Sequence, residues 1–439
     1  MKQSQAAVPQ AAVPQVPPPE SSSLPGPALR PLELAVGTPL GFDPPRQAWG
    51  PTHPTVSPVA ALEDELSAAL ARPPCLVSFS GGRDSSGLLA LAAKLSREKG
   101  LPAPIPVTML FPGDSAAEES EWQTTVVREL GLDDWVRIEV RQGELDAVGP
   151  VAQVVLKRHG LLWPPNLYMH YPILRRARGG SLVTGFGGDE VAQLSASARA
   201  ERLVVRQQRA GATDLLVTLG FALAPKALRA VAYRLRFHEE LPWLTEEGYA
   251  AARAATAAES AAYPFGFDRK LRLAKRSRYR TTSLASLEVL GASLDVQLFS
   301  PLAADPVMDA IAAKGGIPGL GYRADMVRLL FGGVLPPAVL ARRSKASFTA
   351  QILSEASVSF AAQWSGEGLD KGLVDPQKLR EHWLSDQRSA PSTALLQAAW
   401  LHDNSTSAPP VGHQPPSASH APMKQEMAGS YVEEPPSGS

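Results

Sequence analysis

The chain has 439 residues, and 44% of them are hydrophobic, which is enough for a large buried core. Lys and Arg together number 43, as do Asp and Glu, so the formal net charge is zero. This balance excludes the overall basic field that nonspecific nucleic-acid and membrane-surface binders use, and the single cysteine excludes an intramolecular disulfide or a cysteine-based zinc site.

The two ends of the chain share a composition that does not favour folding. Residues 1–56 are dense in Pro, Ala, Gln and Ser and begin without the apolar segment of a signal peptide. Residues 405–439 repeat this bias and lack apolar periodicity. We therefore expect a disordered Pro-rich arm and a disordered tail around one domain at residues 57–404. With one cysteine and no apolar run of membrane-spanning length, the sequence favours a cytoplasmic protein that does not bind membranes.

Alternating strands and helices are predicted in the first half of this domain. Apolar periodicity predicts an amphipathic helix at residues 61–70, and a short apolar run predicts a buried strand at residues 75–79, followed by a glycine turn and a second helix. Three further strands are predicted at residues 105–111, 135–140 and 181–186, the first of them followed by a helix from about Ala116. This order is typical of an α/β fold with a parallel sheet flanked by helices. The Ala-, Arg- and Leu-rich sequence after Val191 predicts a mostly helical C-terminal half.

The stretch SFSGGRDSSG, residues 78–87, lies where the first strand gives way to its helix. Gly81 and Gly82 allow backbone amides to approach an anion, and the helix directs its N-terminal amides at the same point, which favours phosphate. Hydroxyl donors are added by Ser80 and Ser85. Asp84 would repel a bare phosphate, so its presence argues for Mg²⁺ between the two. The stretch is neither a Walker loop nor GxGxxG, so neither γ-phosphoryl transfer nor dinucleotide binding is expected.

Three segments resemble the signatures of one enzyme family. SFSGGRDSSG resembles the pyrophosphatase loop, SGGxDS, of enzymes that cleave ATP between the α and β phosphates. LVTGFGGDEV, residues 182–191, resembles the second signature of the asparagine synthetase-like family, which is matched by Thr184, Gly185, Gly187, Asp189 and Glu190. The segment from Gly321 resembles the family's C-terminal pattern, which is matched by Arg323, Arg328, Leu335, Pro336, Arg343, Lys345 and Phe348. The three segments follow the family order across residues 60–401.

This resemblance implies the adenine nucleotide alpha hydrolase-like (HUP-type) fold and an ATP-dependent ligase that uses Mg²⁺, as in asparagine biosynthesis. Such an enzyme activates a carboxylate as an acyl-adenylate, releases pyrophosphate, and lets ammonia or an amine displace AMP. The implied catalytic residues are Glu190, Arg343 and Lys345. The implied ATP-binding residues are Ser78, Ser80, Gly81, Gly82, Asp84, Ser85, Gly187 and Gly188. The implied Mg²⁺ ligands are Asp84 and Asp189, which end two different strands.

The sequence departs from the family pattern in two places. Glutamine-dependent members begin with a glutaminase domain that has a nucleophilic cysteine at its first position, whereas only about seventy Pro-rich residues precede the loop here. We therefore expect the nitrogen to come from free ammonia, a separate glutaminase or an amine of the substrate. The family glutamate four residues before a proline is replaced by Gln297, with Asp295 the nearest carboxylate. This disfavours aspartate and leaves open asparagine synthesis and amide or lactam formation in specialised metabolism, from a small-molecule or peptide carboxylate.

Other interpretations stay open. The basic run DRKLRLAKRSRYR, residues 268–280, is interpreted as a solvated helix face, or as arginines near the nucleotide or an acidic substrate, rather than as a nucleic-acid site. The same loop occurs in tRNA-modifying enzymes, and a degenerate scaffold could bind nucleotide without turnover while its tails bind protein partners. His170 and Trp163 are expected to be packing residues.

Overall fold

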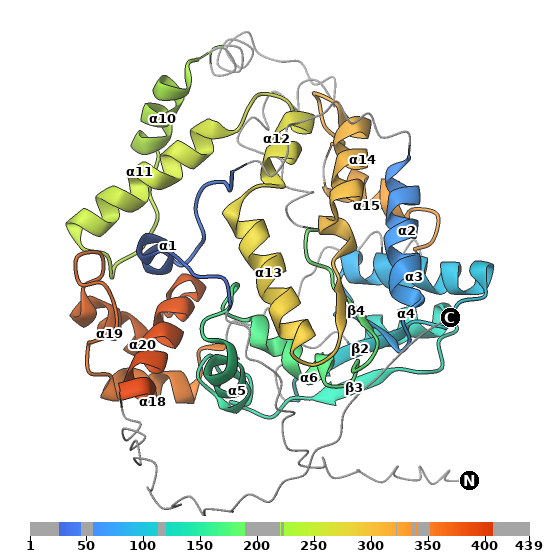
Figure 1. Cartoon of the computed structure of the whole chain (residues 1–439), viewed down its shortest axis with the longest axis horizontal. Helices are drawn as coiled ribbons and strands as arrows, with labels where there is room; N and C mark the ends of the chain where they lie inside the picture. Colours follow the sequence, from blue (N-terminus) through green and yellow to red (C-terminus); the bar gives the residue numbers. More distant parts are fainter. Residues whose placement is uncertain are drawn as a thin grey trace, which may run out of the picture.

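The fold is built on a parallel β-sheet (Figure 1). The computed structural model describes residues 26–44, 56–112, 120–188, 220, 224–321, 323–335, 339 and 352–406. Five strands form the sheet in the order β3-β2-β1-β4-β5, and every neighbouring pair is parallel. They are β1 (Cys75–Ser78), β2 (Ile105–Leu110), β3 (Val136–Glu139), β4 (Ser181–Val183) and β5 (Gln297–Phe299). The expected α/β fold with a parallel sheet is confirmed.

The direction of the strand order reverses at β1. From β1 the chain proceeds outward to β2 and β3, and then returns to the other side of β1 to form β4 and β5. Val77 of β1 pairs with Val183 of β4, while Ser78 pairs with Val107 of β2. The carboxyl ends of β1 and β4 are therefore neighbours at the reversal, which is where open α/β sheets form a crevice for ligands.

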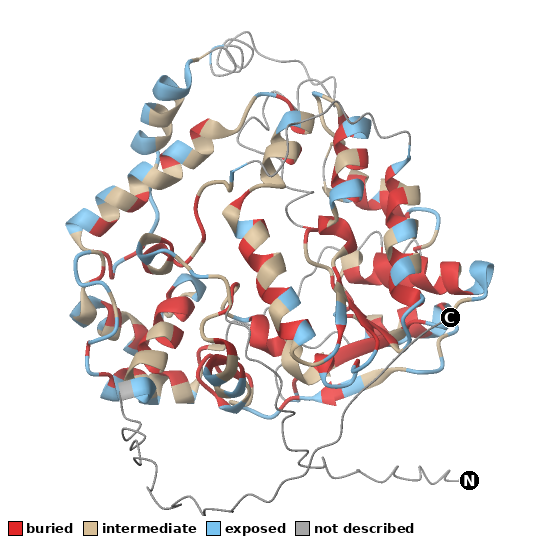
Figure 2. Ribbon diagram, in the orientation of Figure 1, coloured by how far each residue is buried: buried red, intermediate tan, exposed pale blue. Residues whose placement is uncertain are grey.

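Helices cover both faces of the sheet, and the side chains of β1, β4 and β5 alternate between two cores. Figure 2 shows that the sheet is largely buried. Leu76 of β1 packs into one core, and Val77 packs into the other. The core around Leu76 includes residues of α5 (Pro150–His159), α13 (Arg278–Ala292) and α20 (Thr393–Thr406). The core around Val77 includes residues of α2 (Pro58–Leu70), α3 (Arg83–Lys99), α14 (Asp305–Gly315) and α15 (Arg323–Phe331).

The described part of the chain after residue 191 is mostly helical, as expected, with β5 as the exception. The predicted helix at residues 61–70 and the four predicted strands are also confirmed, and the helix expected after β2 is described from Ser120. Within the described ranges, no helix combines the length and apolarity needed to cross a membrane. The remaining elements are α4 (Ser120–Glu129), η1 (Leu167–His170), α6 (Tyr171–Leu174), α10 (Lys226–Leu235), α11 (Glu246–Ala262), α12 (Phe267–Ala274), η2 (Pro301–Ala303), α18 (Glu355–Gln363), α19 (Pro376–Leu384) and η3 (Ala390–Ser392).

Residues 26–44 differ from the expected disordered arm. They include the helix α1 (Pro31–Val36), which ends at Gly37 with φ +70°, where an added Cβ would lie 2.0 Å from the carbonyl oxygen of Pro391. The indole Nε1 of Trp243 donates to the carbonyl of Ala35 at 2.8 Å. The segment is therefore packed into the body of the protein. The rest of the expected arm up to residue 55, and the tail from residue 407, lie outside the described residues.

A buried ion pair fastens this segment to α13. The Glu33 side chain is 2% exposed, and its two oxygens accept from Nε and Nη2 of Arg278 at 2.5 and 2.9 Å. The same carboxylate accepts from the backbone amides of Arg30 and Leu40. Further along the segment, the carboxylate of Asp43 accepts from the hydroxyl of Thr281 at 2.5 Å. The composition of residues 26–44 did not predict an ordered segment, because the residues that hold it in place lie more than two hundred positions away in sequence.

A second buried carboxylate ties the C-terminal helices to the sheet. Asp146 has no exposed surface and lies in the connection between β3 and α5. Its two oxygens accept from the backbone amides and hydroxyls of Ser354 and Ser357, and from the amide of Val148. The N-terminus of α18 is thereby fixed against the body of the protein.

We predict that Glu33→Gln destabilises the protein. The substitution removes the closer and more buried of the two carboxylates that face the guanidinium of Arg278 and leaves only Asp43, whose Oδ1 lies 3.4 Å from Nη1, which costs about 3 kcal/mol. Urea unfolding followed by circular dichroism measures the change. Glu367→Gln is the control, because it removes one partner of the exposed Glu367–Lys371 pair and should change stability little. Equal effects of the two substitutions would contradict the structural role of residues 26–44.

The same pair predicts a pH dependence. Burial raises the pKa of Glu33, but hydrogen bonds from Arg278, Arg30 and Leu40 outweigh it and hold the pKa below the usual 4.5. A lowered pKa in the folded state contributes stability that is present above pH 4.5 and is lost as the pH falls through the lowered pKa. The stability difference between the wild type and Glu33→Gln should therefore shrink below pH 4.5, and a constant difference would contradict this assignment.

Candidate active site

The SGGRDS stretch forms a turn at the carboxyl end of β1, beside β4, where the strand order reverses. Gly81 adopts φ +84°, and α3 begins directly after Gly82, which has no side chain to cap the helix amides. Ser80 Oγ lies 3.3 Å from the amide nitrogen of Gly82 and 3.3 Å from Ser85 Oγ, while Ser85 Oγ donates to the carbonyl of Gly82 at 3.1 Å. The turn thus brings two hydroxyls to the N-terminus of a 17-residue helix, an arrangement that suits an anion.

Side chains from β2 and α4 hold the carbonyls of this turn. Thr108 Oγ1 donates to the carbonyl of Phe79 at 2.8 Å, and Trp135 Nε1 donates to Thr108 Oγ1 at 3.1 Å. Gln123 Nε2 donates to the carbonyl of Ser80 at 3.1 Å. Because the C=O and N–H of a trans peptide point in opposite directions, the next amides along the turn face away from β2 and α4. Sequence reasoning missed these residues, although a polar Thr108 inside an apolar strand was a usable signal.

The second signature lies directly beside the first. Gly187 has φ +97°, and a Cβ at that position would lie 2.5 Å from the backbone nitrogen of Ala303. A Cβ at Gly188 would lie 2.6 Å from Oδ2 of Asp84, so the carboxylate is in close contact with the backbone of the second turn. Thr184 Oγ1 and Ser300 Oγ, at the carboxyl ends of β4 and β5, are 2.8 Å apart. Close approach therefore requires glycine at both positions.

The third segment reaches the same point through α15. Arg323, the first residue of α15, forms an ion pair with Asp84 across 239 residues of sequence. The helix can approach α3 because Gly87 has no side chain: a Cβ there would lie 2.4 Å from the ring of Phe331. The Asp84 side chain is 14% exposed, and that of Arg323 is 33% exposed. Residues of all three segments thus meet at one half-buried carboxylate.

The structure brings together most of the predicted nucleotide-binding residues. Ser80, Gly81, Gly82, Asp84, Ser85, Gly187 and Gly188 line the two turns, and Ser78 is the last residue of β1. The other predicted site residues lie outside the described residues and stay predictions: Asp189, Glu190, Arg343 and Lys345.

The donor set around Asp84 is compatible with Mg²⁺. Among the described residues, no group of three His, Cys, Asp or Glu side chains could hold a metal ion. Proteins usually hold Mg²⁺ through one or two carboxylates together with phosphate oxygens and water. Asp84 is a carboxylate at a turn suited to phosphate, and it lies against Gly188, the residue before Asp189. These residues therefore fit a cation that also contacts a nucleotide.

Gln297 and Asp295 lie at the opposite end of the sheet from these turns. Gln297 pairs with Ser181, the first residue of β4, and its Oε1 accepts from Arg72 Nη1 at 2.5 Å. Asp295 precedes β5, and its carbonyl accepts from the amide of Gly179. Neither side chain therefore lies beside the two glycine turns.

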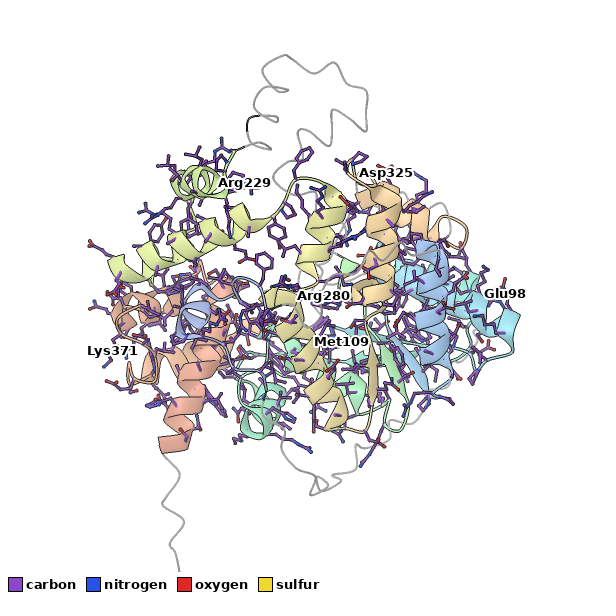
Figure 3. All side chains as sticks on the ribbon, turned by 45° about the horizontal axis from the view of Figure 1, so that its top comes forward. Glu98, Met109, Arg229, Arg280, Asp325 and Lys371 are labelled. Carbon is purple, nitrogen blue, oxygen red and sulfur yellow. The ribbon has the colours of Figure 1, made fainter. Side chains whose placement is uncertain are left out.

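The basic run at residues 268–280 is largely paired inside the protein, so the expectation of a solvated face is wrong for several of its members. Lys275 pairs with Asp309 at 2.9 Å, and Arg278 pairs with Glu33. Arg280 is buried, donates to the carbonyl of Ala303 and pairs with Asp305 at 2.7 Å; Figure 3 shows it near the middle of the molecule. Arg276 donates to the carbonyl of Asp43. These groups position α12, α13 and η2 instead of facing a nucleic acid.

The other side chains of chemical interest are buried or half-buried. Trp163 is 5% exposed, and its backbone amide donates to Ser286 Oγ at 3.0 Å. Burial lowers the pKa of His170, whose Nδ1 lies 3.3 Å from the carbonyl oxygen of Leu167. Burial also raises the pKa of Cys75 to about 11, so this thiol is a poor nucleophile.

Comparison with protein families identifies the family of most of the chain. A family model described as asparagine synthase matches residues 60–403. No curated protein matches the sequence. The matched range contains the whole sheet and the three segments that meet at Asp84, whereas residues 26–44 lie outside it.

We predict that Gly188→Ala disturbs the site without unfolding the protein. The added Cβ meets the end of the Asp84 side chain, which can rotate away, so the carboxylate moves while the fold remains. Binding of Mg²⁺ and ATP, measured by titration calorimetry, should weaken about tenfold. Gly333→Ala is the control, since this exposed glycine lies outside the two turns and a Cβ there meets no atom within 4 Å. Equal binding by both variants would contradict the placement of Asp84.

Proposed function

The chain belongs to the asparagine synthase family, and on that premise we propose that it forms an amide bond between a carboxylate and ammonia or an amine, using ATP. Members of this family are ATP-dependent ligases that usually require Mg²⁺. The observation that carries the proposal is the meeting of three distant segments at Asp84: the SGGRDS turn, the second glycine turn and Arg323 of α15. Each contributes a group suited to phosphate or to the cation that accompanies it.

The first step is adenylation of the carboxylate. A carboxylate oxygen attacks the α phosphorus of ATP, and the bond from that phosphorus to the oxygen bridging to the β phosphorus breaks. Pyrophosphate leaves with the bonding electrons, and an acyl-adenylate remains. The amides at the N-terminus of α3 and the hydroxyls of Ser80 and Ser85 would bind the departing pyrophosphate. Adenylation supplies a better leaving group than the hydroxide of the free acid.

Asp84 and Asp189 would hold the Mg²⁺ that accompanies ATP. When bound, the ion neutralises negative charge that develops on the pyrophosphate. Arg323 lies beside Asp84 and would place a second positive charge near the same phosphates. Asp84 contacts the backbone of Gly188, so the two glycine turns are neighbours. Both turns would therefore contact the same polyphosphate.

The second step forms the amide. The nitrogen lone pair attacks the acyl carbon, the bond from that carbon to the AMP oxygen breaks, and the nitrogen loses a proton. Lys345 would stabilise the tetrahedral oxyanion, and Arg343 and Glu190 are the other proposed catalytic residues, on the strength of their positions in the family pattern. The nitrogen would come from free ammonia, a separate glutaminase or an amine of the substrate.

The carboxylate is proposed to be a small molecule or a peptide. Gln297 and Asp295, the residues nearest to the family glutamate in sequence, lie at the amino ends of the strands, so they give no support to aspartate as the substrate. Asparagine and a specialised amide or lactam are both possible products of the same two steps. A cytoplasmic location, where ATP is abundant, is proposed with them.

Exchange of [³²P]pyrophosphate into ATP, measured with a panel of amino acids, other carboxylates and short peptides, tests this function. Stimulation by one carboxylate establishes adenylation. Asp84→Asn and Lys345→Ala should each lower that exchange by about a hundredfold. Asp325→Asn is the control, because Asp325 pairs on the surface with Arg328 of the same helix that carries Arg323, and it should leave exchange unchanged. Nucleotide binding without any exchange would instead support a scaffold that does not turn over.

A further inference from the structure

Three aromatic side chains lie together beside the second glycine turn. Phe186, within that turn, stacks on Tyr279 with ring centroids 6.4 Å apart and planes 19° from parallel. Trp163 meets Tyr279 edge-on, with centroids 6.1 Å apart and an angle of 77°. Such pairs of rings prefer offset stacked or edge-to-face packing, so each ring fixes the next. We call Phe186, Tyr279 and Trp163 the aromatic cluster.

The cluster is buried at one end and exposed at the other. Trp163 is 5% exposed, whereas Tyr279, in the first turn of α13, is 37% exposed. Trp163 is further fixed by the hydrogen bond from its backbone amide to Ser286 Oγ. Its indole N–H is buried and finds no acceptor among the described residues. An aromatic ring that is held this firmly and is still exposed is suited to bind a ligand.

The position of the cluster connects it to the proposed reaction. Phe186 lies two residues before Gly188, whose backbone contacts the carboxylate of Asp84. In the proposed adenylation, the nucleotide is held beside Asp84, and the carboxylate of the substrate must reach the α phosphorus of that nucleotide. The remainder of the substrate would then lie near the turn that carries Phe186.

The two arginines on either side of Tyr279 are paired within the protein. Arg278 pairs with Glu33, and Arg280 pairs with Asp305. These two side chains therefore do not offer an ion pair to a second charged group on the substrate. Among the described residues, the exposed side chain between them is the aromatic ring of Tyr279.

We infer that the aromatic cluster binds a planar apolar group of the carboxylate substrate, so that the acid activated here is an aromatic one. This inference rests on the proposed function and specifies its substrate class. The aromatic ring would pack against the exposed part of the Tyr279 side chain while the carboxylate points toward the nucleotide.

The test compares two carboxylates of similar length, one planar and one not. Titration calorimetry on the full chain with Mg²⁺ and α,β-methylene-ATP, which cannot be cleaved between those phosphates, measures binding of 3-phenylpropionate and hexanoate. The wild type should bind 3-phenylpropionate more tightly. Tyr279→Leu, which keeps apolar volume but removes the ring, should weaken that binding roughly three- to tenfold and remove the preference. Phe265→Leu, at an aromatic residue outside the cluster that is 41% exposed, should do neither.

The possible outcomes separate this inference from the proposed function. Phe186→Leu provides a second variant, and thermal melting checks that each variant folds. A wild type without preference for 3-phenylpropionate, or a preference that survives both Tyr279→Leu and Phe186→Leu, would overturn the inference. If α,β-methylene-ATP binds in either case, the proposed ATP chemistry still stands. If it does not bind, the proposed function fails, and the preference is then measured without nucleotide.

Discussion

The ion pair and backbone contact at Asp84 are the constraint on which the rest of the site depends. The carboxylate of Asp84, in the first turn of α3, forms an ion pair with Arg323 of α15 and contacts Gly188, which follows β4. These contacts are possible only because β1 and β4 are adjacent parallel strands, whose carboxyl ends meet at the reversal of the strand order. The sheet topology therefore positions the chemistry, and the glycines remove the side chains that would keep the turns apart.

Sequence patterns predicted correctly the elements whose structure depends on residues close together in the chain. The SGGRDS turn was predictable because a buried strand, two glycines and an amphipathic helix follow one another within a short stretch. The parallel sheet was predictable because its inner strands are apolar runs between helices. By contrast, β5 has three residues and no alternating pattern of its own, and only its pairing with β4 identifies it as a strand.

Residues that act through distant partners could not be predicted in this way. Glu33 reads as a solvated glutamate in a Pro-rich segment, yet it is buried against an arginine 245 residues later. Thr108 and Gln123 act on the site through backbone carbonyls, which carry no sequence signature. The basic run at residues 268–280 suggested a solvated helix face, or arginines near the nucleotide or an acidic substrate. Sequence alone does not show that Asp43, Glu33, Asp305 and Asp309 surround it. Pairing over long distances was therefore the main information missing from the sequence.

The packing of residues 26–44 means that the unit that folds is larger than the region that defines the family. Residues 26–44 lie before the matched range of 60–403, but they pack against α13, Trp243 and Pro391. A protease cut between residues 44 and 56 would turn this segment into a peptide ligand that the rest of the protein retains. Two separately produced fragments would then reassemble by complementation, and a chain beginning at the family boundary would carry Arg278 without either of its carboxylate partners.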